Sequence, residues 1–158
     1  MDFLYISPEF PPNYANFILQ LHAHGVRVWG LGEAEFYAMP PALRSALAWY
    51  IRADLKDFDA VQQALDQLLE QKTSAGPTGG FDVVESHNEQ WLTLEGLIND
   101  RYGIDGIKRK DLPRLKKKSR MKLIFKDLDM PVARGELVSA TEQALELADQ
   151  LGYPLILK

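Results

Sequence analysis

The 158-residue chain contains no cysteine, which excludes disulfides, thiolate nucleophiles and cysteine metal ligands together. Histidine is nearly as scarce. The three histidines, His22, His24 and His87, have no metal-ligand spacing with one another or with nearby carboxylates. We therefore expect no metal site formed by this chain alone.

Long apolar runs are also missing, and Met1-Asp2-Phe3 begins without the basic stretch that precedes an export signal. With no cysteine, export or membrane segment to indicate otherwise, we expect a cytoplasmic protein with no membrane contact.

Glycine is absent from the segment Ser7-Pro8-Glu9-Phe10-Pro11 that follows the first expected strand. A dinucleotide fingerprint needs glycine there, so NAD and FAD are not expected ligands.

Positive charge is concentrated in one segment, although the whole chain carries −4. Residues 108–122 hold nine of the 18 basic residues beside the single acid Asp111, so this segment is +8 and the remainder −12. Three interpretations stay open: a solvated connecting segment, a nucleic-acid contact, and a lysine placed for a nucleotide. Nucleic acid is disfavoured, because no aromatic residue interleaves the basic ones for base stacking and the rest of the chain would repel a polyanion.

Hydrophobic periodicity predicts an α/β domain over residues 1–110. Buried strands are expected at 3–7, 26–31 and 81–85, with helices at 12–24, 57–69 and 88–103, and a short helix 40–47 and strand 49–51 between them. Gly25 and Gly103 are expected to end helices, and residues 73–80 to form a flexible turn. Alternating strands and helices predict a Rossmann-like, mostly parallel sheet covered by helices.

Residues 111–158 predict a second, smaller α/β unit. Helices are expected at 118–128 and 139–151, the latter starting with a capping box at Ser139-Ala140-Thr141-Glu142, and strands at 131–138 and 154–158. This unit looks incomplete, because the final strand ends on Lys158 with nothing after it to finish a pocket.

The segment Glu85-Ser86-His87-Asn88-Glu89 follows a strand, where ligands of open parallel sheets bind. Two interpretations are open: Asn88 caps the next helix with Glu89 against its positive end, or Glu85, Asn88 and Glu89 bind a polar substrate. Gly30-Leu31-Gly32 is expected to be an ordinary turn.

Three segments taken in order resemble the ATP-grasp superfamily. Lys118 opens a helix, Met130-Pro131-Val132-Ala133-Arg134 resembles the family's Gly-Ile-Pro-Val turn, and Gly152-Tyr153-Pro154-Leu155-Ile156-Leu157-Lys158 resembles its lysine-bearing strand. Asp129-Met130 departs from the usual Gly-Ile. Residues 1–110 then resemble the preATP-grasp domain, and residues 111–158 the truncated start of an incomplete ATP-grasp fold, with a likeness to stand-alone relatives of the carbamoyl-phosphate synthase large chain.

The resemblance implies an enzyme that uses ATP to convert a small-molecule carboxylate to an acylphosphate, which an amine then attacks. It implies that Lys118 and Lys158 bind ATP, and that the Mg²⁺ ligands and phosphate lid lie in a remainder of the domain outside this chain. We accordingly expect the chain alone to be inactive and able to form a homo-oligomer through exposed apolar edges. The alternative is a non-catalytic Rossmann-like module that binds a ligand or partner.

Overall fold

The computed structural model describes residues 1–75 and 79–157. The chain divides into two units, Met1–Leu112 and Pro113–Lys158, and each is described by itself. Within the described ranges, no helix is both long enough and apolar enough to span a lipid bilayer.

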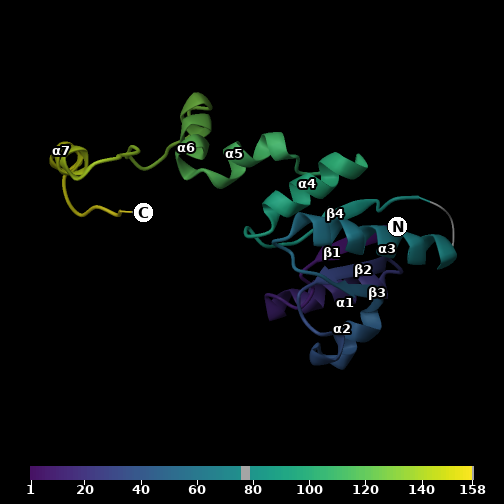
Figure 1. Cartoon of the computed structure of the whole chain (residues 1–158). Coiled ribbons are helices and arrows are strands. Elements are labelled where there is room, and N and C mark those ends of the chain that lie inside the picture. Colours follow the sequence, from purple (N-terminus) through teal and green to yellow (C-terminus); the bar gives the residue numbers. More distant parts are fainter. Residues whose placement is uncertain (76–78, 158) are drawn as a thin grey trace. The chain divides into compact units, whose positions relative to one another are not determined.

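A four-stranded parallel sheet organises the first unit (Figure 1). Its strands are β1 Asp2–Ile6, β2 Arg27–Gly32, β3 Leu47–Arg52 and β4 Val83–Glu85, in the spatial order β3-β2-β1-β4. The register pairs Leu4 of β1 with Trp29 of β2 and with Val84 of β4. The predicted mostly parallel α/β sheet is therefore confirmed.

Helices join the strands and cover both faces of the sheet. They are η1 Pro12–Tyr14, α1 Ala15–Ala23, η2 Phe36–Ala38, α2 Pro41–Ala46, α3 Phe58–Ala75, α4 Leu92–Tyr102 and η3 Arg109–Asp111. The short helix and strand expected near residues 40–51 are present as α2 and β3. Gly25 and Gly103 follow α1 and α4 with φ of 76° and 65°, the left-handed conformation predicted for them.

Alternation along β1 separates two hydrophobic cores, because successive side chains of a strand point to opposite faces. Leu4 and Ile6 pack with α3 and α4, whereas Phe3 and Tyr5 pack with α1 and α2. Parallel strands buried on both faces must be apolar almost throughout, and all five residues of β1 are buried.

Gly30 and Gly32 lie inside β2 and do not form the ordinary turn expected from the sequence. A Cβ on Gly30 would lie 2.8 Å from the Tyr50 ring, and one on Gly32 would lie 2.3 Å from Glu9 Oε2. Neighbouring side chains therefore approach the strand closely at both glycines, and the approach is least adjustable at Gly30, where the neighbour is an aromatic ring.

A buried ion pair stabilises the amino end of the sheet. The Nζ of Lys72, 4% exposed, lies 3.0 Å from Asp2 Oδ2 and donates to the Gly79 carbonyl. Trp29 Nε1 and Arg27 Nη2 also donate to the Asp2 carboxylate, at 2.9 and 2.7 Å. Burial by itself raises the pKa of Asp2, but hydrogen bonds from Trp29, Lys72 and Arg27 outweigh it and lower this pKa.

This arrangement corrects the prediction of a flexible turn at residues 73–80. Helix α3 continues to Ala75, and Gly79 accepts the bond from Lys72, while residues 76–78 lie outside the described part of the chain.

The second unit contains α5 Leu112–Lys116, which begins at the unit boundary, α6 Lys118–Asp127 and α7 Thr141–Leu151. The two helices predicted here are confirmed as α6 and α7. The predicted strands 131–138 and 154–158 are not formed over the described residues 131–138 and 154–157. A strand requires a neighbouring ladder to pair its backbone groups, and no second strand stands beside these segments in the described residues of this unit.

The predicted capping box of α7 is also wrong in its register. The N-cap is Ala140, and the Gln143 side chain accepts hydrogen bonds from the Ser139 N–H at 3.1 Å and hydroxyl at 3.2 Å. Burial in this unit is slight: Ala148 is the buried apolar residue of α7, whereas Leu145 is 59% exposed.

We predict that Asp2→Asn lowers the free energy of unfolding by about 3 to 5 kcal/mol at neutral pH, because it leaves the buried Lys72 ammonium without its counter-ion. Urea unfolding measured by tryptophan fluorescence provides the test. The same experiment on Arg52→Gln, which removes an exposed ion pair with Glu35, should show a loss below about 1 kcal/mol. Equal losses in the two variants would contradict a special role for the buried pair.

Candidate functional site at the carboxyl edge of the sheet

The strand order places a topological switch point between β1 and β4. From β1 the chain proceeds outward through β2 to β3, and it then crosses back to add β4 on the other side of β1. Connections on the two sides of this point diverge, which opens a crevice outside the carboxyl ends of the strands where open α/β sheets bind ligands. The segments that border it are residues 7–14 after β1 and residues 86–91 after β4.

The turn after β4 is organised by the Glu85 carboxylate. Its Oε1 accepts hydrogen bonds from the backbone N–H groups of Ser86 and His87, each at 3.0 Å. His87 has φ of 50°, a left-handed conformation that is uncommon for a residue with a side chain. Glu85 thus holds the imidazole of His87 at the edge of the sheet.

A second carboxyl group lies behind this turn. Glu95, from the first turn of α4, is 2% exposed, and its Oε2 lies 3.1 Å from the hydroxyl of the fully buried Ser86. Burial and then the nearby Glu85 carboxylate raise the pKa of Glu95 to about 7. The Ser86 hydroxyl also lies 3.2 Å from the Asn88 carbonyl and has only one hydrogen to donate. It can donate this hydrogen to Glu95 Oε2 or to the Asn88 carbonyl, but not fully to both.

An aromatic group adjoins the Glu85 carboxyl. The His87 ring stacks on Tyr5 at 5.5 Å with an interplanar angle of 14°, and it lies 4.3 Å from Phe17 and 5.5 Å from Tyr14. Tyr5 is fully buried, and its hydroxyl has no hydrogen-bond partner in the described ranges; the same is true of His87 Nδ1. Burial, the Glu85 carboxylate and Tyr14 raise the pKa of Tyr5, so its hydroxyl stays protonated.

Glu9, from the segment after β1, bonds to the segment after β2. Its Oε1 accepts from the N–H groups of Glu33 and Ala34, at 2.8 and 3.3 Å, immediately after β2. The anion-binding backbone groups at the end of β2 are therefore occupied by a side chain of the protein itself.

The residues predicted from the sequence are placed as follows. Asn88 and Glu89 lie in the turn after Glu85, and α4 begins only at Leu92, with Trp91 and not Asn88 as its N-cap. Asn88 Oδ1 instead accepts from the Gln90 N–H at 3.0 Å, so the predicted helix cap is wrong. Lys118 is the exposed first residue of α6, and Lys158 lies outside the described residues.

Tyr5, His87 and Glu95 are the site residues that sequence reasoning missed. Tyr5 occupies an ordinary apolar position of a strand, and Glu95 lies in a helix whose periodicity gives no sign of a buried acid. A usable signal was that Glu95, a charged residue, lies between Leu94 and Gly96 in a part of α4 that is buried.

Lys108, from the basic segment, has a structural role. Its Nζ donates to the carbonyls of Asn99 and Ile104 at the end of α4. One member of the segment therefore satisfies helix-terminal carbonyls rather than a ligand.

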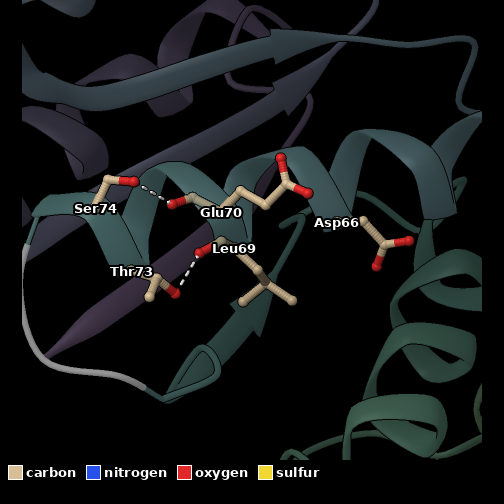
Figure 2. A pocket seen from close by; sticks show the side chains of 5 residues that line it. All are labelled: Asp66, Leu69, Glu70, Thr73 and Ser74. Atoms are coloured by element: carbon tan, nitrogen blue, oxygen red, sulfur yellow. Dashed lines mark hydrogen bonds between the residues drawn. The ribbon is translucent and has the colours of Figure 1, made fainter.

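Elsewhere, a hollow on the surface of α3 is lined by Asp66, Leu69, Glu70, Thr73 and Ser74 (Figure 2). Its two hydroxyls donate to carbonyls of the same helix, Thr73 to Leu69 and Ser74 to Glu70. Polar groups already bonded within one helix do not converge on a ligand, so this hollow is not the candidate site. Over the described residues, no group of three or more histidine, aspartate and glutamate side chains is arranged to hold a metal ion.

We predict that Glu95→Gln flattens the dependence of stability on pH. A folded pKa above the unfolded value of 4.5 means that the folded state binds the proton more tightly, so this contribution is fully present below pH 4.5 and is lost as the pH rises through about 7. The difference in free energy of unfolding between wild type and variant should change by about 3 kcal/mol over that window. Denaturant unfolding at several pH values measures it.

The same substitution at the exposed Glu70 of α3 is the matched control, because it removes no buried carboxyl. If wild type and Glu95→Gln give parallel profiles between pH 4.5 and 7, then Glu95 does not titrate as the structure indicates.

No family model matches the sequence. Three solved structures that share this fold are ATP-grasp ligases. Phosphoribosylglycinamide synthetase from Anaerococcus prevotii matches 97% of this chain with a TM-score of 0.65 and 14% identity. L-amino acid ligase from Bacillus licheniformis matches 94% of this chain with a TM-score of 0.59 and 14% identity. The third is the biotin carboxylase domain of 2-oxoglutarate carboxylase from Hydrogenobacter thermophilus, determined with MgADP, ADP and bicarbonate. It matches 96% of this chain with a TM-score of 0.66 and 13% identity.

This chain spans 35%, 41% and 33% of the three matched chains, respectively. At these identities the likeness shows the fold: an α/β parallel sheet of the type found in the N-terminal portion of these ligases.

Proposed function

We propose that this chain is the N-terminal portion of an ATP-dependent ligase of the ATP-grasp type. The reaction is activation of a small-molecule carboxylate as an acylphosphate, followed by attack of an amine or similar nucleophile. The observation that carries the proposal is the match of 94–97% of the chain to three ATP-grasp ligases. The ordered segments around Lys118, Met130–Arg134 and Gly152–Lys158 support it independently of the fold.

In this proposal Lys118 and Lys158 bind the nucleotide. Phosphoryl transfer requires cations against the phosphate oxygens and Mg²⁺ bridging them, because the protein contributes by positioning and electrostatic stabilisation. Lys118 stands in the exposed first turn of α6, where an anionic phosphate would also meet the positive end of the helix. The Mg²⁺ ligands belong to the remainder of the ATP-grasp domain.

Contact with that remainder also accounts for the exposed apolar side chains of the second unit. The most exposed of them are Leu128, Leu137, Tyr153, Ile156 and Leu157. We propose that the rest of the domain covers them in the complete enzyme, and that a second copy does so when the chain is isolated. The proposed setting is the cytoplasm, where the ATP concentration supports ligation.

We predict that Lys158→Ala in the full-length protein weakens ATP binding by roughly 1.5 to 3 kcal/mol, the range of one charge-assisted contact. Isothermal titration calorimetry with ATP and Mg²⁺ measures the change. Lys126→Ala, at an exposed position near the end of α6, is the matched control and should leave the affinity unaltered. Equal affinities of the wild type and Lys158→Ala would remove Lys158 from the nucleotide site.

Phosphate release by the full-length protein, assayed with a panel of amino acids as carboxylate and amine donors, tests the reaction class. Release that requires both ATP and a carboxylate supports the ligase. ATP binding without any such release, or no ATP binding, supports the non-catalytic ligand-binding module instead.

A further inference from the structure

The two chain segments that border the switch point are poor in positive charge. No lysine or arginine occurs in residues 1–26 or 73–100, the two segments that include β1, β4 and the turns after them. Glu85 is the last residue of β4, and Glu89 follows in the turn after it. A carboxylate or phosphate bound beside Glu85 would be repelled by its carboxylate, whereas a cation would be attracted to it.

Unsatisfied hydrogen-bonding groups lie in the same place. Tyr5 and Glu85 are paired across β1 and β4, so their side chains stand on the same face of the sheet. The Tyr5 hydroxyl and His87 Nδ1 have no partner within the described residues, although both atoms are buried. A buried polar group without a partner is costly, so each of these atoms indicates a group that binds beside it.

The number and chemistry of these groups fit one kind of ligand. An alkylammonium has three N–H donors, and this edge of the sheet carries three acceptors: the Glu85 carboxylate, the Tyr5 hydroxyl oxygen, and the His87 Nδ1 in the tautomer protonated on Nε2. Aromatic faces favour a neighbouring cation, and the rings of Tyr14 and Phe17 border the imidazole. Phe17 is 39% exposed, so this wall opens to solvent.

We propose that the carboxyl ends of β1 and β4 form a subsite for a protonated primary amine, with Glu85 as its counter-ion and Tyr5 and His87 as its hydrogen-bond acceptors. The identity of this amine as the nucleophile of ligation rests on the proposed function; its binding does not. The first unit thereby selects the amine, while the two lysines belong to the nucleotide.

The test uses three probes of nearly equal size on the full-length protein: n-propylammonium, n-propanol and propionate. NMR signals of the His87 and Tyr5 rings are followed during titration. We expect saturable shifts with n-propylammonium and none with n-propanol or propionate at the same concentrations. Shifts of similar size with all three probes, or no shift with n-propylammonium, would overturn the proposal; the second result would mean that the unpaired atoms bind only water.

Two variants assign the binding groups. Glu85→Gln keeps an oxygen that accepts from Ser86 and His87 but removes the charge, and it should weaken n-propylammonium binding roughly tenfold or more. Tyr5→Phe deletes only the hydroxyl and should weaken it roughly threefold to tenfold. Thermal unfolding confirms that each variant is folded.

Glu70→Gln, on the exposed surface of α3, controls for nonspecific attraction and should bind n-propylammonium as the wild type does. If it weakens binding as much as Glu85→Gln does, the cation is held by general charge and the subsite is refuted. Failure of the ligase proposal is a separate result: n-propylammonium binding at His87 without ATP-dependent phosphate release retains the subsite and rejects the ligase.

Discussion

Burial of both faces of a parallel sheet is the constraint on which the first unit depends. β1 lies between β2 and β4, and its residues are buried on both sides, so its side chains are almost entirely apolar. Polar chemistry is therefore displaced to the two ends of the strands. At the amino end it takes the form of an ion pair that stabilises the fold, and at the carboxyl end it forms the candidate site.

The two ends differ in how completely their polar groups are satisfied. At the amino end the Asp2 carboxylate has three side-chain donors, from Arg27, Trp29 and Lys72, and its pKa is lowered. At the carboxyl end the Glu95 pKa is raised, and the Tyr5 hydroxyl lacks a partner among the described residues. Fully satisfied groups indicate a structural role, whereas incompletely satisfied buried groups are typical of binding sites.

The second unit lacks a buried layer of this kind. Its helices α6 and α7 are amphipathic, yet little of their apolar surface is buried within the unit. Helices depend on packing of their apolar face for most of their stability. The segments predicted as strands in this unit form no ladder over the described residues 131–138 and 154–157, for the same lack of neighbours. In the proposed ligase, the remainder of the domain supplies both a surface for the helices to pack against and strands to pair with these segments.

The sequence by itself determined the alternating strands and helices of residues 1–110, the helix-ending Gly25 and Gly103, and the helices α6 and α7. These features depend on local periodicity and backbone conformation, which neighbouring residues specify. Glu85 was also predictable as a site residue, because the end of a parallel strand is a recurrent ligand position.

Only the tertiary structure decided the rest. Strand order made β1 and β4 neighbours and so brought Tyr5 to Glu85, 80 residues further along the chain. Helix packing buried Glu95 behind Ser86, and side-chain approach, not turn formation, explained Gly30 and Gly32. The physical reason is that a pKa, a buried ion pair or an unsatisfied hydroxyl depends on groups that are distant in sequence and become neighbours only when the chain folds.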